Sequence, residues 1–145
     1  MIIDTTYLLP LARIGVKHDL LRAIVEGRVE GLGLKDLGLS LISLFELQAK
    51  AARLGIPPEH VIRAVRAVIR SFRVVPFYNS KIIETAHNLR TVMNNYTDCI
   101  IVATAAVLKE DLVTEDRVIH EHAGFIEDRY GIKIYSYRDL TKQRN

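Results

Sequence analysis

Residues 97–118 read TDCIIVATAAVLKEDLVTEDRV, and this segment decides the fold. The run at 99–108 is apolar almost all round, which predicts a helix that is packed on most of its sides. After a short turn, residues 112–114 are too few for a helix and suit a core strand. Asp98 stands in the first turn of the helix, and Asp116 follows the strand. If the helix packs back against the sheet, these two carboxylates lie on the same rim.

Short apolar runs elsewhere in the chain predict strands at 1–3, 39–42, 74–77, 112–114 and 132–135. Helices are predicted at about 5–15, 17–29, 43–55, 59–71, 79–93, 97–108 and 117–123. Ser43 opens a Ser-x-x-Glu capping box with Glu46, and Thr97 is the predicted cap of the central helix. Strands separated by helices indicate an α/β fold, in which a parallel sheet carries helices on both faces. No repeat or linker interrupts the pattern, so we expect residues 1–145 to form a single domain.

Composition favours a globular protein with a mild excess of positive charge. The chain has 145 residues, of which 49% are hydrophobic, enough for one domain with a core. The net charge of +3 is compatible with a polyanionic partner. A single cysteine, Cys99, excludes an internal disulfide framework. The sequence contains no signal peptide, membrane span, zinc-type histidine pattern, Walker motif or dinucleotide-binding loop, and we expect a cytoplasmic protein.

Four acidic residues stand near predicted strand ends or helix starts. Asp4 follows the first strand, Glu46 lies in the first turn of the helix after the second strand, and Asp98 and Asp116 flank the fourth strand as described above. Ligands of open α/β sheets bind at the carboxyl ends of the strands, so these acids are candidates for one site. Each also has a purely structural explanation, because acids cap helices and favour their positive ends. The structural explanations do not require the four side chains to meet.

Convergence of these acids would have an energetic consequence. Two unit charges 4 Å apart repel by about 4 kcal/mol at an effective dielectric constant near 20. Four ionised carboxylates in one cleft are therefore unfavourable unless some are protonated or a cation lies among them. Oxygen ligands without cysteine or histidine select Mg²⁺ or Mn²⁺. Such an ion can activate a water molecule for attack on a phosphodiester.

At this point the sequence resembles a known family. Residues 1–6 (MIIDTT), 42–46 (ISLFE), 97–105 (TDCIIVATA) and 112–117 (LVTEDR) are similar, in the same order, to the PIN domain, and above all to the VapC-type toxins. The resemblance spans nearly the whole chain. It implies a three-layer α/β/α sandwich with a central parallel sheet of about five short strands. It also implies metal-dependent cleavage of RNA.

The resemblance gives roles to individual residues. Asp4, Glu46, Asp98 and Asp116, which we name the acid cluster, match the acidic quartet of the family. The three aspartates would contact Mg²⁺ or Mn²⁺ directly or through water, and Glu46 would hold a metal-bound water or a second ion. The neighbouring hydroxyl residues that would orient these carboxylates are Thr5 and Thr114. The implied partners are an RNA substrate, a small antitoxin protein and a second copy of the chain.

A basic stripe accompanies the acids. Arg63, Arg66, Arg70 and Arg73 recur at helical spacing and could follow a phosphate backbone of RNA. The alternative is an ordinary solvated helix face, because exposed arginine is common.

Two other functional classes compete with the nuclease hypothesis. A catalytically silent PIN-like module that binds RNA or protein could keep the acids for capping alone. A phosphoryl-accepting receiver domain, or a phosphatase with an Asp-x-Asp motif, would need a second acid close to Asp4, whereas Thr5 and Thr6 follow it here.

Overall fold

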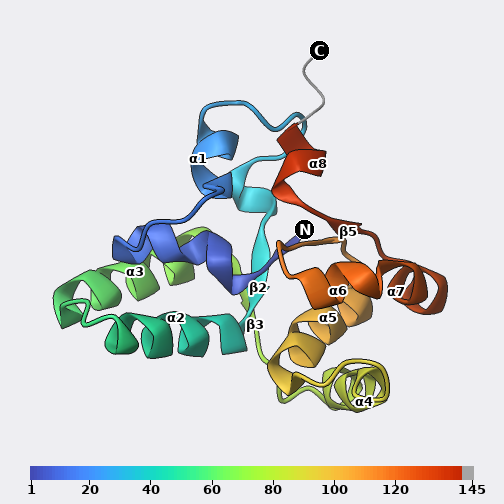
Figure 1. Cartoon of the computed structure of the whole chain (residues 1–145). Coiled ribbons are helices and arrows are strands. Elements are labelled where there is room, and N and C mark those ends of the chain that lie inside the picture. Colours follow the sequence, from blue (N-terminus) through green and yellow to red (C-terminus); the bar gives the residue numbers. More distant parts are fainter. Residues whose placement is uncertain (142–145) are drawn as a thin grey trace.

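A parallel sheet of five short strands runs through the computed structural model, which describes residues 1–141 (Figure 1). The strands lie in the order β3-β2-β1-β4-β5, and all neighbouring pairs are parallel. Their bounds are β1 Ile2–Ile3, β2 Gly38–Ser40, β3 Arg73–Val75, β4 Leu112–Val113 and β5 Ile134–Tyr135. The strand order reverses between β1 and β4. The carboxyl ends of these two strands therefore lie side by side, where α/β folds place their ligands.

Helices cover both faces of this sheet, which confirms the expected three-layer α/β/α architecture (Figure 1). Their bounds are η1 Thr5–Ala12, α1 Leu20–Val25, η2 Leu34–Asp36, α2 Leu41–Arg53, α3 Pro58–Ser71, α4 Ser80–Leu89, α5 Tyr96–Leu108, α6 Arg117–Glu121, α7 Ala123–Tyr130 and α8 Tyr137–Thr141. The elements η1, α1, α2 and α3 lie on one side and α4 to α7 on the other. None of the helices within residues 1–141 combines the length and the apolar character needed to cross a membrane.

The core forms one layer on each face of the sheet, because side chains alternate between the two faces along each strand. Ile2 of β1 packs into the core cluster of α4 and α5, whereas its neighbour Ile3 packs into the cluster of η1 and α1. Leu112 and Val113 of β4 divide in the same way, because successive side chains of a strand point to opposite faces. Helix α5 is buried from Cys99 to Ala106, as its apolar sequence predicts.

Several predicted boundaries were wrong. Helix α1 is shorter than the predicted 17–29, because the Asp19 side chain caps it by accepting from the backbone N–H of Arg22, and the left-handed Gly27 follows its end. Helix α4 ends at Leu89 rather than near residue 93. Just after its end, the Thr91 hydroxyl donates a hydrogen bond to the Asn88 carbonyl.

Two predicted helix caps were also displaced. Helix α5 begins at Tyr96 after Asn95, whose side chain accepts from the backbone N–H of Asp98, so Thr97 is not the cap. Helix α2 begins at Leu41 after Ser40, and the predicted capping box at Ser43 does not form. In both places an equally good capping residue stands two or three positions earlier, where the preceding strand or loop ends.

A charged network ties the amino ends of the strands together. The carboxylate of Glu110, which precedes β4, accepts from the terminal ammonium of Met1 at 2.7 Å and from both terminal nitrogens of Arg73 at 2.6 and 2.7 Å. Hydrogen bonds from Arg73, and then the Met1 ammonium, lower the pKa of Glu110 to about 2. One carboxylate thus links the first residue of the chain to β3 at the sheet edge. Arg73 lies in β3 and is paired, so it does not extend the basic stripe, contrary to the sequence analysis.

Glu110→Gln is expected to lower the free energy of unfolding at pH 7 by about 1–2 kcal/mol, because a bidentate charge-assisted pair is lost. The folded pKa of Glu110 lies below its ordinary value of 4.5. Its contribution is therefore complete above that value and disappears as the pH falls towards about 2. Urea unfolding followed by circular dichroism at pH 7, 5 and 3 measures the difference. Glu121→Gln, which removes an exposed i,i+4 pair with Arg117, is the matched control. An equal loss at pH 7 and pH 3 would contradict the assignment.

Candidate functional site

Asp4 is the most buried member of the acid cluster, with 9% of its surface exposed. It follows β1 directly and caps η1, since its Oδ1 accepts from the backbone N–H of Thr5 at 2.7 Å. Its Oδ2 accepts from the hydroxyl of Thr114, at the end of β4, at 2.5 Å. Both carboxylate oxygens are therefore held by donors on neighbouring strand ends, and the orientation of the carboxylate is fixed.

Asp116 is joined to Asp4 through the same threonine. The Thr114 hydroxyl that donates to Asp4 also accepts from the backbone N–H of Asp116 at 3.0 Å. Asp116 then caps α6 by accepting from the backbone N–H of Ile119 at 2.9 Å. Asp4 and Asp116 are therefore both helix caps and close neighbours, so the capping role of each acid does not keep the two carboxylates apart.

Glu46 belongs to the second turn of α2, the sixth residue from its start, and not to the first turn as the sequence analysis placed it. This displacement follows from the cap at Ser40. Glu46 therefore has no capping role, and its Oε1 instead accepts from the Thr5 hydroxyl at 2.6 Å. The same hydroxyl lies 2.9 Å from that of the buried Ser43. Thr5 thus connects Glu46 with the backbone beside Asp4.

Asp98 lies half-buried in the first turn of α5. Its pKa is raised to about 7, first by burial and then by the charges of Asp116, Asp4 and Glu46. The pKa values of Asp4 and Glu46 are raised as well, again mainly by burial. Carboxylates from four separate elements are therefore close enough to oppose one another's ionisation.

The arginines of the basic stripe lie elsewhere. Arg63, Arg66 and Arg70 are exposed on α3 and line a pocket of about 540 Å³ that none of the four acids lines. Within residues 1–141 none of these three arginines forms an ion pair with a carboxylate. Arg63, Arg66 and Arg70 thus form an unpaired positive surface within the described residues, separate from the acid cluster.

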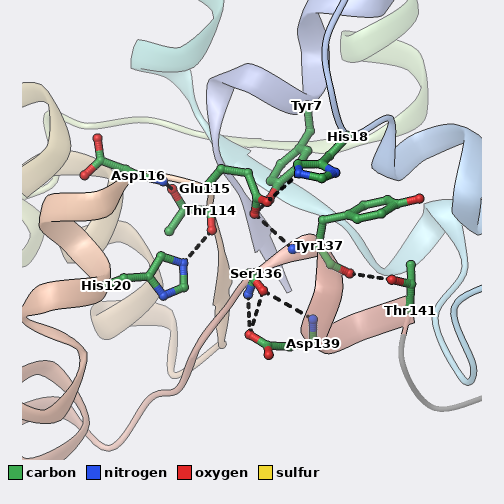
Figure 2. Close-up of polar contacts among 10 residues, drawn as sticks. All are labelled: Tyr7, His18, Thr114, Glu115, Asp116, His120, Ser136, Tyr137, Asp139 and Thr141. Atoms are coloured by element: carbon green, nitrogen blue, oxygen red, sulfur yellow. Dashed lines mark hydrogen bonds and ion pairs between the residues drawn. The ribbon is translucent and has the colours of Figure 1, made fainter.

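Glu115 is a site-bordering residue that the sequence analysis missed. Its Oε2 accepts from the hydroxyl of the buried Tyr7 at 2.7 Å and from the backbone N–H of Tyr137 at 3.0 Å. His18 lies 3.6 Å from the other carboxylate oxygen and stacks on the Tyr137 ring. Figure 2 shows the side chains of Glu115 and Asp116 pointing to opposite sides of the chain. Glu115 thereby anchors the loop that carries Asp116 to η1 and α8.

Alternation along the strand was the signal that could have revealed Glu115. Because successive residues of an extended segment face opposite ways, an acid between Thr114 and Asp116 must point away from the cluster, into the layer of η1. His120 adds a further contact to this loop, with its Nε2 2.7 Å from the Thr114 carbonyl oxygen (Figure 2).

The donor set of the cluster suits a hard divalent cation. It consists of carboxylate and hydroxyl oxygens, which Mg²⁺ and Mn²⁺ prefer. In the described part of the chain, no three His, Cys, Asp or Glu side chains are arranged so that they could hold an ion directly. Mg²⁺ keeps several waters and commonly uses only one or two protein carboxylates. The residues therefore fit a hydrated cation that some of the acids would reach through water.

Comparison with known proteins gives a family match and several similar folds. The family model described as PIN domain matches residues 1–125. No curated protein matches. Among solved structures, a toxin-antitoxin complex from Klebsiella pneumoniae is 22% identical with a TM-score of 0.59, covering 85% of this chain and 90% of that one.

Two further structures are similar over most of their length. FitAcB from Neisseria gonorrhoeae is 20% identical with a TM-score of 0.68, and the match covers 97% of this chain and all of that one. VapBC-1 from nontypeable Haemophilus influenzae is 20% identical with a TM-score of 0.64, and the match covers 94% of this chain and 96% of that one. At such identities the likeness carries the fold alone.

Asp98→Asn is expected to raise the free energy of unfolding of the metal-free protein at pH 8 by about 1 kcal/mol, because it removes a carboxylate whose ionised form is disfavoured in the folded state. The gain is limited to this size because solvent screens a half-buried carboxylate. The folded pKa of Asp98 is about 7 and its ordinary value is 3.8. The wild-type free energy of unfolding therefore falls as the pH rises between these values and is flat above them, whereas the asparagine carries no such penalty. Urea unfolding in EDTA at pH 4 and pH 8 measures the difference. The exposed Asp128→Asn on α7 is the control. A variant less stable than wild type at pH 8 would contradict the crowding of charge.

Proposed function

The chain belongs to the PIN domain family, and we propose that it is an endoribonuclease that uses Mg²⁺ or Mn²⁺ held by Asp4, Glu46, Asp98 and Asp116. PIN domains are in general nucleases. The observation that supports the proposal most is the state of Asp98, whose pKa is raised to about 7 by burial and by the three other acids of the cluster. An enzyme that binds a divalent cation there would turn this unfavourable charge into binding energy.

Each residue of the site would then have a definite task. A cation bound among the acids would supply Lewis acidity, which lowers the pKa of water and neutralises phosphodiester charge. Thr114 and the backbone N–H of Thr5 fix the carboxylate of Asp4, and the hydroxyl of Thr5 fixes that of Glu46. The start of α5, beside Asp98, presents backbone N–H groups and a positive helix end that favour a phosphate.

We further propose that the protein is the toxin of a toxin-antitoxin pair and acts in the cytoplasm. The support is the similarity in fold to FitAcB, VapBC-1 and the Klebsiella complex. A small antitoxin could neutralise the enzyme by placing a basic side chain among the acids, since the same negative charge that attracts a cation would attract it. A homodimer is expected as well. Exposed apolar side chains such as Phe125 of α7 and Ile83 of α4 are available for its interface.

The alternative is a catalytically silent PIN-like module that binds RNA or protein. The caps formed by Asp4 and Asp116 favour it, because helix capping alone would give these two acids a purpose. Among the described residues, neither the Glu46 nor the Asp98 side chain accepts a capping hydrogen bond, which is why we prefer the enzyme. Activity separates the two functions.

With Mn²⁺ or Mg²⁺ the purified protein is expected to cleave single-stranded RNA, and EDTA is expected to abolish this cleavage. Asp98→Asn should lower the rate by at least about 100-fold, because both charge and ligand are lost. A gel assay with a labelled RNA oligonucleotide measures the cleavage rates of the wild type and of Asp98→Asn. The matched control is Asp128→Asn, at an exposed position of α7. Equal cleavage by wild type and Asp98→Asn would reject the assignment. Binding of RNA without cleavage by the wild type would favour the silent module.

The basic stripe on α3 is proposed to contact the RNA backbone. Arg66→Ala with Arg70→Ala should weaken binding of single-stranded RNA and reduce the slope of log affinity against log salt concentration by about 1.4, because two phosphate contacts are lost. Fluorescence anisotropy in EDTA at 50 to 200 mM salt measures the slope. Arg22→Ala with Arg117→Ala, which removes two exposed arginines that pair within their own helices, is the control. An unchanged slope would leave α3 as an ordinary solvated face.

A further inference from the structure

A second pocket lies where α4 ends and α5 begins. His87, Arg90, Thr91 and Tyr96 line it, and we name it the ring pocket. It is an open hollow of about 540 Å³, and its four lining residues are all exposed. We propose that the ring pocket binds one nucleotide of single-stranded RNA, adjacent to the nucleotides at the acid cluster. This inference rests on the proposed function, because it adds a substrate subsite to the nuclease.

The aromatic side chains supply a stacking surface. The rings of His87 and Tyr96 meet edge to face, with their centroids 5.4 Å apart and their planes at 73°. This contact holds the Tyr96 ring in place while 39% of the residue stays exposed. Single-stranded RNA is bound by stacking its bases on exposed aromatic rings. A ring that is both supported and accessible suits that use.

Arg90 supplies the positive charge. Among the residues that the structure describes, its guanidinium forms hydrogen bonds to two neutral oxygens, the carbonyl of Met93 and the side-chain amide of Asn94, each at 3.5 Å. No carboxylate of residues 1–141 forms an ion pair with it. An exposed arginine with long contacts to neutral groups is available to pair with a phosphate. The described lining of the ring pocket contains polar and aromatic side chains and no purely aliphatic one, which favours a nucleotide over an apolar peptide.

The position of the ring pocket connects it with the acid cluster. Tyr96 is the first residue of α5 and Asp98 the third, so their side chains point about 200° apart around the same helix start. An RNA strand with a phosphate at the acids would pass around the amino end of α5 to place a base on Tyr96.

The sequence contains no tryptophan, so the fluorescence of one introduced tryptophan can be observed without background from another. In Tyr96→Trp, the emission of a single tryptophan reports on the ring pocket alone. Titration with a single-stranded RNA decamer in EDTA should quench this emission saturably, because stacked bases quench indole. Tyr78→Trp, at a side chain that is 71% exposed in the segment before α4, should show no saturable quenching.

The second experiment compares affinities for the same decamer by fluorescence anisotropy in EDTA. Tyr96→Ala and Arg90→Gln should each bind about tenfold more weakly than wild type. Tyr96→Phe should bind as wild type does, because the ring is kept. The matched controls are Tyr78→Ala and the exposed Arg129→Gln on α7, both expected to bind normally. Thermal unfolding of each variant tests whether the fold is retained. Tyr96→Phe separates loss of the ring from loss of structure.

The outcomes separate the ring pocket from the nuclease itself. Weaker binding by Tyr96→Ala and Arg90→Gln, with normal binding by Tyr96→Phe and saturable quenching in Tyr96→Trp, supports the subsite. Normal binding by Tyr96→Ala and Arg90→Gln, in a protein that still cleaves RNA with Mn²⁺, overturns the subsite and leaves the proposed function standing. A wild type that neither binds nor cleaves the decamer overturns both.

Discussion

The hydrogen bond between Thr114 and Asp4 joins residues that are 110 positions apart in the sequence. It exists because β1 and β4 are parallel neighbours in register, so that both chains leave the sheet at the same edge. The same threonine receives the backbone N–H of Asp116, which makes it the meeting point of both strand ends. The positions of the other acids follow, because α2 and α5 pack against the sheet that this pairing creates. The site is thus a product of strand order more than of any local motif.

Burial and charge oppose each other at this edge. Asp4 lies almost wholly within the protein and Asp98 is half covered, yet both are acids whose ionised forms favour water. Thr114 and the Thr5 backbone recover part of the lost solvation at Asp4. Within the described residues no hydrogen bond to the Asp98 carboxylate does the same, and its pKa is raised accordingly. Acids whose pKa is shifted by burial together with neighbouring charges cluster at functional sites.

Much of this arrangement could be predicted from the sequence, because the deciding signals were local. The apolar run of α5, the short strands and the acids beside them indicated the sheet and its edge. The helix caps were missed where two capable residues compete, as Ser40 does with Ser43, and only the end of the preceding strand decides between them. Glu115 was missed for a different reason. Alternation along the chain indicates the side to which it points, but its partners, Tyr7 and Tyr137, are brought to it by tertiary packing.

The assembly of the acid cluster from four elements has a bearing on how the chain is made. Asp4 emerges from the ribosome early, but its neighbour β4 and the loop holding Asp116 follow only after more than a hundred further residues. Domains fold as units during synthesis. A growing polypeptide therefore carries isolated acids, and the four carboxylates can meet only after β4 and the loop that holds Asp116 have left the ribosome.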